Sequence, residues 1–337
     1  MMLQLFTKVR NFEREEYQKN VNFCLKFPFW YDLTFLSFSA DVGIAMGSGV
    51  DVAKQAADVV LLDDNFATIV VAIEEGRIMF DNLKKCFMYI LSSNVPEIAA
   101  FILFLICQIP LPIGALAILA IDLGTDMLPA ISLAYEEEEV RNESMKKGPR
   151  NPRTEGLLDE KMIFMSCGQI GLVEAAAGFF TYFVIMAENG FWPSRLLGLR
   201  TLWESRAVND LRDSYDQEWT YEDRKSLEYA CHAGFFWSIV LVQWVAVIMV
   251  RSKKQSVFRR GMKNGILNIS LIFETLIALM LIYVPGINGG LQMSMLSPLS
   301  WFPPLPFVIF LFTYDEVRKA IIRKYPGGWA EQESCLE

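Results

Sequence analysis

The chain has 337 residues, 53% of them hydrophobic, and a formal net charge of −8 at pH 7. This is more apolar surface than one soluble core of this size needs, so the composition favours a membrane protein. The acidic balance argues against a nucleic-acid partner, because phosphate binding requires a basic face. The six cysteines show no C-x-x-C spacing, which argues against a zinc site and a disulfide framework.

The chain begins with a segment, residues 1–39, that matches no pattern we can assign, and its charges exclude a cleavable signal peptide. In residues 40–66, two short apolar runs flank a helical stretch, which predicts strand, helix and strand. This segment is interpreted as a small remnant of an α/β domain. The helical pattern that starts at Ala67 continues past Lys85, which predicts a stalk helix over residues 67–85 that leads directly into a membrane span.

Six apolar stretches have about the length that a helix needs to cross a bilayer. They predict an α-helical membrane protein with its spans in hairpins, a transmembrane domain over residues 86–325 and a cytoplasmic tail over 326–337. Clusters of Lys and Arg precede the first span and follow the second, fourth and sixth, so all four lie on one face, predicted to be cytoplasmic. The predicted spans are 86–109, 111–135, 162–187, 233–250, 266–284 and 299–314.

Polar side chains surround a proline in the first span. Pro96 cannot donate to the carbonyl four residues earlier, at Ser92, and Ser93, Asn94 and Glu97 place side-chain oxygens beside that freed backbone. Ionisable groups in hydrocarbon are costly and usually face the interior of a bundle. This segment is therefore a candidate cation site.

The second span carries two aspartates. The spacing of Asp122, Thr125 and Asp126 predicts that all three share one face of a helix. Together, the two spans would offer carboxylates, an amide and hydroxyls, a ligand set suited to a hard cation. The alternative is that the acids are protonated or paired for packing alone.

Two further acids stand alone in the later spans. Glu174 and Glu274 are candidates for an additional cation site, and a purely structural role is an equally good interpretation. Gln243 is a weaker candidate, because an amide that joins two helices explains it as well.

Several short segments follow one another in an order typical of one family. Together they resemble, from about residue 40 almost to the C-terminus, the catalytic α subunits of sodium/potassium-ATPases and proton/potassium-ATPases, which are P-type cation pumps. Ser93 stands where the proton pumps have lysine and Asp122 where calcium pumps have asparagine, so the chain resembles the sodium/potassium branch. The segments are 43–47, 61–66, 81–85, 93–97, 121–127 and 314–319.

The resemblance implies that Na⁺ and K⁺ are the transported ions and that the chain is a multi-pass protein of the plasma membrane. It also implies a β-subunit partner in addition to the lipid bilayer. The implied cation ligands are Ser93, Asn94, Glu97, Asp122, Thr125 and Asp126. The implied β-subunit contacts are Ser214, Tyr215, Gln217, Trp219 and Tyr221.

The chain departs from the family pattern at the third sodium site. Ala246 follows Gln243-Trp244-Val245 where the family has aspartate, and Phe273-Glu274 replaces a pair of glutamates. Glu174 stands where glutamine is expected, and our hypothesis is that it restores a carboxylate near that gap.

The family's phosphorylated-aspartate loop, magnesium loop and dephosphorylation motif do not occur in the sequence. Phosphoryl transfer needs a positioned nucleophile and metal, so the chain alone is not expected to hydrolyse ATP, and ATP and Mg²⁺ are expected only for a full-length member. The leading hypothesis is the C-terminal membrane portion of a sodium/potassium-transporting α subunit. The alternatives are a non-catalytic membrane partner that binds β subunits and limits pump assembly, and a cation-conducting pore. Ser256, after two lysines, is a candidate phosphorylation site.

Overall fold

The computed structural model describes residues 42–65, 67–137, 143–146, 148, 156–326 and 328. It divides into two compact units, one of residues 1–78 with 140–155 and one of residues 79–139 with 156–337. Residues 1–39 of the sequence, which we could not assign, lie outside the described part.

The first unit holds a two-stranded parallel sheet. Strand β1 (Ile44–Met46) pairs with β2 (Val59–Leu61), and helix α3 (Asp51–Ala56) connects them. The inward-facing residues form a small apolar cluster of Ile44, Met46, Leu61 and Ile69. The prediction of strand, helix and strand is confirmed. The described part of this unit also includes α7 (Glu143–Lys146).

The pattern that starts at Ala67 forms one continuous helix, α4 (Ala67–Ile106), with Pro96 inside it. This confirms that the predicted stalk and the first span are a single helix. The domain boundaries drawn from the sequence stay a prediction.

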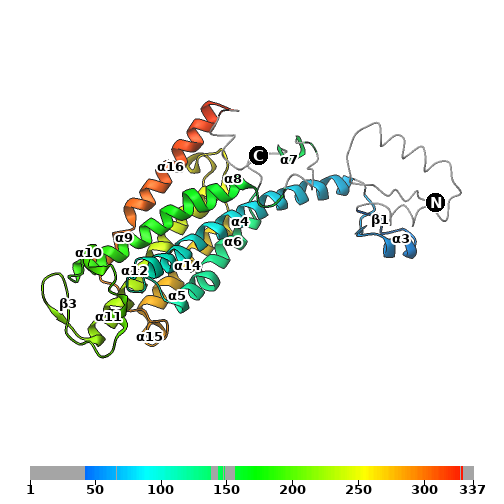
Figure 1. Cartoon of the computed structure of the whole chain (residues 1–337). Coiled ribbons are helices and arrows are strands. Elements are labelled where there is room, and N and C mark those ends of the chain that lie inside the picture. Colours follow the sequence, from blue (N-terminus) through cyan, green and yellow to red (C-terminus); the bar gives the residue numbers. More distant parts are fainter. Residues whose placement is uncertain are drawn as a thin grey trace. The chain divides into compact units, whose positions relative to one another are not determined.

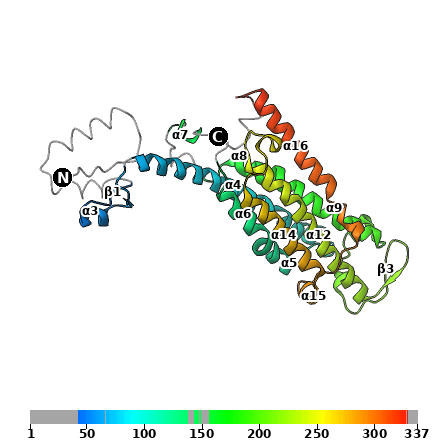
Figure 2. The same ribbon diagram turned by 180° about the vertical axis from the view of Figure 1, so that it is seen from behind.

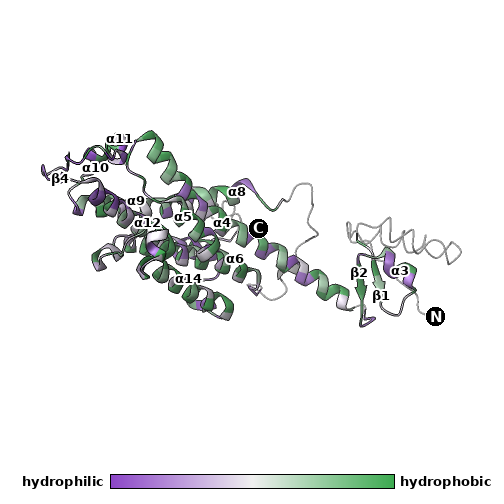
Figure 3. Cartoon of the chain, turned by 90° about the horizontal axis from the view of Figure 1, so that it is seen from below, coloured by the Kyte–Doolittle hydropathy of each residue, from purple (hydrophilic) through white to green (hydrophobic). Residues whose placement is uncertain are grey.

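The second unit is a helical bundle (Figures 1 and 2). Apolar residues run along its long helices, whereas hydrophilic residues gather on the short elements α10, α11 and β4 (Figure 3). After α4, its elements are α5 (Ala115–Ala120), η1 (Ile121–Asp126), α6 (Met127–Ala134), α8 (Glu160–Ile163), η2 (Phe164–Gly171), α9 (Leu172–Glu188), α10 (Pro193–Leu196), α11 (Arg200–Glu204), β3 (Leu211–Arg212), β4 (Glu218–Trp219), α12 (Tyr221–Arg251), α13 (Val257–Arg260), α14 (Gly265–Tyr283), α15 (Ile287–Gly290), η3 (Pro298–Trp301) and α16 (Leu305–Lys324).

Five helical stretches among the described residues are long and apolar enough to cross a membrane. They overlap the first five predicted spans, which confirms a multi-pass membrane protein. They are Ala67–Ile106, Ala115–Ala134, Glu160–Glu188, Tyr221–Arg251 and Gly265–Tyr283.

The sixth predicted span does not reach this standard. Its first residues form the short 3₁₀ helix η3, and α16 starts only at Leu305. From Asp315 onward α16 is charged, so its apolar part is about half as long as the 20 residues that a span needs. Five of the six predicted spans therefore correspond to helices that are long and apolar enough to cross a membrane.

Helices α9 and α12 pack closely against each other, because each has a glycine at the contact. A Cβ atom on Gly178 would lie 2.8 Å from the ring of Phe235, and one on Gly234 would collide with Ile185. On each of the two helices, a large side chain of the other helix therefore packs directly against a glycine. Phe179 adds an edge-to-face contact with Phe235, at 5.3 Å between ring centroids.

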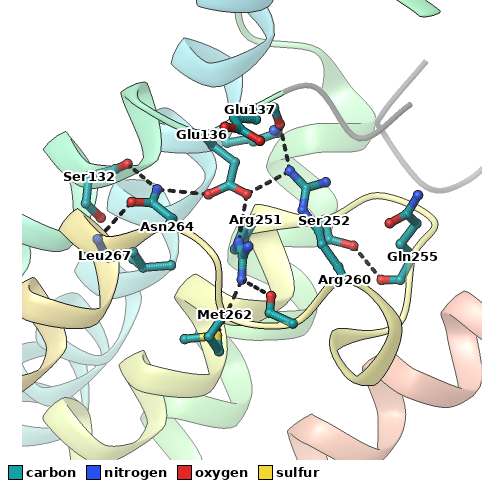
Figure 4. A network of polar contacts seen from close by, with 12 residues as sticks. Ser132, Glu136, Glu137, Arg251, Ser252, Gln255, Arg260, Met262, Asn264 and Leu267 are labelled. Atoms are coloured by element: carbon teal, nitrogen blue, oxygen red, sulfur yellow. Dashed lines mark hydrogen bonds and ion pairs between the residues drawn. The ribbon is translucent and has the colours of Figure 1, made fainter. Parts of the chain in front are cut away.

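A buried carboxylate joins the ends of three helices beyond the apolar layer (Figure 4). Glu136, which follows α6, accepts hydrogen bonds from Arg251 Nε at 2.8 Å, Arg260 Nη2 at 2.7 Å and Asn264 Nδ2 at 2.9 Å. Burial would raise the pKa of Glu136, but the hydrogen bonds from Asn264 and Arg251 and the charges of Arg251 and Arg260 outweigh it and lower this pKa below its usual value. We call these four residues the Glu136 network.

Candidate cation site

The polar segment of the first span lies in the middle of α4. Ser93 Oγ and Asn94 Nδ2 both donate to the carbonyl oxygen of Ile90, at 3.0 and 2.8 Å, and Glu97 is buried with its Oε1 unpaired. Because the Asn94 side chain donates its amide N–H to the backbone, its amide oxygen stays available as a ligand. The helix continues through Pro96, so oxygen-bearing side chains gather here without a break in the chain.

The second span contains a π-helical segment where the sequence predicts an α-helix. In η1, Thr125 and Asp126 are buried, whereas Asp122 is exposed. Asp122 nevertheless remains a charged neighbour of both Asp126 and Glu97, and its place on their helical face stays a prediction. Thr125 Oγ1 donates to the Ile121 carbonyl at 3.0 Å, and Asp126 keeps its Oδ2 unpaired.

Polar side chains with at least one unpaired atom gather around Asp126. Buried polar atoms are nearly always paired, so such a group indicates a place for water or an ion. Four of these side chains are fully buried, and they come from α4, α9, α12 and α14. The members are Tyr89, Glu97, Asp126, Glu174, Gln243 and Glu274.

Asp126 is the common electrostatic neighbour of this group. Its charge acts on Glu97, Glu174 and Glu274, and its own nearest polar groups include Ser93, Thr125 and Gln243. The structure thus brings Glu174 and Glu274 into one neighbourhood with the carboxylates of the first two spans. The sequence alone left open whether these two acids belong to a site or to packing.

No three Asp, Glu, His or Cys side chains in the described part of the chain lie close enough together to hold a metal ion by themselves. Any ion at this place would also need neutral oxygens from amides, hydroxyls or the backbone. Such mixed sets are common where membrane proteins coordinate Na⁺.

Helix α9 reaches this region through a glycine. A Cβ atom at Gly171 would lie 2.6 Å from Val95 Cγ2 and 3.0 Å from the Ser92 carbonyl oxygen. The absence of a side chain lets the end of η2 pack directly on the proline-containing turn of α4. Glu174 then follows on the next turn.

Tyr89 is a candidate ligand that our sequence analysis missed. Its side chain is fully buried, its hydroxyl makes no hydrogen bond of standard geometry, and the carboxylates of Asp126, Glu274 and Glu174 lie nearby, with Asp126 close enough to interact with the hydroxyl. Its position in the sequence, one turn before Ser92 and Ser93, was only a weak indication of a ligand. A tyrosine in an apolar helix is usually a packing residue.

The residues expected to contact a β subunit lie on a tight hairpin. Strands β3 and β4 pair antiparallel, and Asp213 Oδ1 accepts hydrogen bonds from the backbone N–H groups of Tyr215 and Gln217 at 2.8 and 2.9 Å. These bonds lower the pKa of Asp213 despite the opposing effect of burial. Tyr215 is exposed at the tip, and Trp219 is half-buried and packs against Phe191.

The other members of the expected contact set also lie on or beside this hairpin. Ser214 Oγ accepts a hydrogen bond from the Trp192 N–H, and Tyr221 begins α12. One buried arginine supports the segment before the hairpin: Arg224 donates to the carbonyl oxygens of Leu202, Ser205 and Val208.

Ser256 caps the N-terminus of α13 by accepting a hydrogen bond from the Phe258 N–H at 3.3 Å. Its side chain is largely buried. The phosphorylation site stays a prediction, and a kinase would first have to release this cap.

Residues 110–321 match the family model of the cation-transporting ATPase C-terminus. The chain belongs to this family. It is 57% identical to the sodium/potassium-transporting ATPase subunit alpha of Drosophila melanogaster over 88% of its length. It is 58% identical, over the same share, to subunit alpha-B of Artemia franciscana and to subunit alpha-2 of Homo sapiens. The chain spans 28 to 29% of the length of these relatives.

The comparisons confirm the family resemblance derived from the short segments, and the membrane bundle is the part of the family that this chain represents. The structure buries most of the residues that the resemblance implied as cation ligands, and it leaves Asp122 exposed.

Proposed function

We propose that the group around Asp126 binds transported Na⁺ and K⁺. The observation that carries this proposal is the set of buried, unpaired oxygens contributed by several helices to one neighbourhood. Leaving such groups unpaired costs about 1 to 3 kcal/mol each, and a bound cation would offset that cost. The proposed ligands are Ser93, Asn94, Glu97, Asp122, Thr125 and Asp126, with Tyr89, Glu174, Gln243 and Glu274 around them.

Glu174 strengthens the proposal of a second cation position. It is fully buried with both carboxylate oxygens unpaired, as is Glu274, and Gln243 adds an unpaired amide. Glu174 of α9 supplies a negative charge next to Asp126 and Glu97, whereas α12 carries Ala246 where the family has an aspartate. This is the role our hypothesis gave to Glu174.

Transport itself is a proposal for the whole protein, since the chain covers less than a third of its relatives' length. In that protein, ATP hydrolysis with Mg²⁺ would power the exchange of Na⁺ and K⁺ across the plasma membrane. The hairpin that carries Tyr215, Gln217 and Trp219 is proposed to bind a β subunit. Nothing in the described residues favours the non-catalytic partner or the pore.

Thermal unfolding of the full chain in detergent tests the ion site. At constant ionic strength, NaCl or KCl in place of the chloride of a bulky organic cation should raise the midpoint by several degrees, because an ion at a hundred times its Kd adds about 2.7 kcal/mol. Asp126→Asn should abolish this rise. Asp216→Asn makes the same chemical change at an exposed hairpin position and should retain it. No ion-dependent rise in the unaltered chain would refute the proposal.

Co-purification tests the hairpin. A β subunit expressed with the chain should be retained by the unaltered protein and lost when Tyr215 and Gln217 are both replaced by alanine. Retention by that double variant would remove the hairpin from the interface.

A further inference from the structure

The single histidine of the chain, His232, lies fully buried in α12 between two backbone carbonyl groups. Its Nδ1 is 2.9 Å from the carbonyl oxygen of Gln292, and its Nε2 is 3.1 Å from that of Leu111. A carbonyl oxygen can only accept a hydrogen bond. A neutral imidazole has one N–H group, so it satisfies one of these contacts, whereas an imidazolium satisfies both.

We propose that His232 is a pH-sensitive clamp that ties the α4–α5 turn to the segment after α15. In its doubly protonated form it donates to Leu111 and Gln292 at once. When it loses a proton, one of the two tethers is broken. The proposal concerns the connection between these segments and does not depend on ion binding.

The turn is built closely around the imidazole. A Cβ atom on Gly114, the residue that precedes α5, would lie 3.3 Å from His232 Nδ1. Gln108 and Gln292, one in each of the two clamped segments, both have positive φ angles, of 48° and 55°. Such conformations are uncommon for residues other than glycine and persist where the surroundings hold them. The two carbonyl contacts of His232 contribute to that restraint.

A second side chain holds the same turn without a charge. Tyr182 of α9 donates its hydroxyl to the Pro110 carbonyl oxygen at 3.0 Å. A phenol keeps this proton throughout the range in which histidine titrates. Tyr182 therefore provides an internal control for the clamp.

The charged groups that face His232 come from its own helix. Glu228 lies one turn earlier and favours the imidazolium, while Lys225 opposes it, and Glu228 Oε2 holds Lys225 Nζ at 2.8 Å. The Tyr229 ring lies 6.1 Å away. The clamped segments, residues 107–114 and 285–296, carry no ionisable side chain except Cys107. Burial is the largest influence on the protonation of His232 and opposes the imidazolium, whereas Glu228 and the two carbonyls favour it.

Nuclear magnetic resonance tests the protonation state directly, because a chain labelled at histidine and purified without a histidine tag gives one imidazole signal. We expect both ring nitrogens to carry protons at the acidic end of the range from about pH 5 to 8, and one to lose its proton within it. A neutral ring at every pH in this range would overturn the proposal. So would a ring that never loses its charge.

Hydrogen exchange tests the consequence. After correction for intrinsic rates, the amides of Leu111, Ile113 and Gly114 should open about tenfold more often once His232 is neutral, as expected for the loss of one hydrogen bond to a charged group. His232→Gln should remove this pH dependence of exchange. Tyr182→Phe should raise the exchange rate at every pH and leave the pH dependence in place. An unchanged pH dependence in His232→Gln would overturn the clamp. If that variant does not fold, the resonance measurement on the unaltered chain still decides.

Discussion

Glu136 and Arg251 form a buried ion pair at the ends of α6 and α12, with 2.8 Å between Oε1 and Nε and less than 5% of either side chain exposed. A second guanidinium, that of Arg260, lies 2.7 Å from the same oxygen (Figure 4). Since α6 directly continues the π-helical segment with Asp126, this pair fixes the end of a helix that carries a proposed ion ligand.

Glu136→Gln should destabilise the bundle by about 3 kcal/mol, because it leaves two buried guanidiniums without their counter-charge. The thermal midpoint in detergent measures the loss. Glu137→Gln changes an acid one residue further on that is exposed, and it should have little effect. Equal midpoints for the two variants would contradict the structural role of Glu136.

The same carboxylate predicts a pH dependence. The pKa of Glu136 is lower in the folded chain than its ordinary value, so its stabilising contribution is fully present at neutral pH and is lost as the pH falls below about 5 through the folded pKa. Unfolding midpoints of the unaltered chain should therefore fall more steeply with acidification than those of Glu136→Gln. Parallel curves would exclude this contribution.

Glu174→Gln should raise the stability of the ion-free chain and at the same time weaken its response to ions. A neutral amide is less costly to bury unpaired than a carboxylate, so the ion-free chain should gain about 1 to 3 kcal/mol. The rise of the midpoint with Na⁺ or K⁺ should at the same time shrink. Glu188→Gln, an exposed site at the end of the same helix, is the matched control and should change neither quantity. A full ion response in Glu174→Gln would remove Glu174 from the site.

Gly171→Ala should cost about 1 to 3 kcal/mol, because the new methyl group would overlap Val95 and crowd the Ser92 carbonyl. Gly76→Ala places the same methyl group on α4 where no atom lies within 4 Å, and higher helix propensity should make it neutral or stabilising. The unfolding midpoints of the two variants are compared. Equal effects would mean that α9 does not approach α4 as described.

Arg224→Lys should lower the free energy of local unfolding of the segment before the β3–β4 hairpin by about 2 to 4 kcal/mol. The reason is that one ammonium cannot reach the several carbonyl oxygens that the guanidinium contacts. Cleavage by chymotrypsin between residues 202 and 220 should become faster. Arg212→Lys alters an exposed arginine paired with Glu218 on the hairpin itself and should leave the rate nearly unchanged.

The sequence predicted most of the fold because hydropathy and length decide which segments cross a membrane. The last predicted span is the exception, because its apolar run ends before Asp315 and covers only half of α16. The sequence also could not foresee the π-helical segments η1 and η2, since their wider turns leave no mark in residue periodicity. Asp122, which the sequence groups with Asp126, is exposed in the structure, although it remains a charged neighbour of Asp126.

The site was predicted in part for a related reason. A carboxylate in an apolar helix is conspicuous in a sequence, so Glu97, Asp126, Glu174 and Glu274 were all found. Whether such acids share one neighbourhood depends on how the helices are arranged, which no local pattern shows. Tyr89 was missed because a hydroxyl on an aromatic ring looks like packing until its lack of a partner is seen.

The reciprocal glycine contacts between α9 and α12 limit how the bundle can move. Phe235 of α12 packs against Gly178 of α9, and Ile185 of α9 packs against Gly234 of α12. Neither helix can therefore slide or rotate against the other without displacing one of these side chains. These two helices therefore make a rigid strut. Any rearrangement of the bundle would move α9 and α12 together.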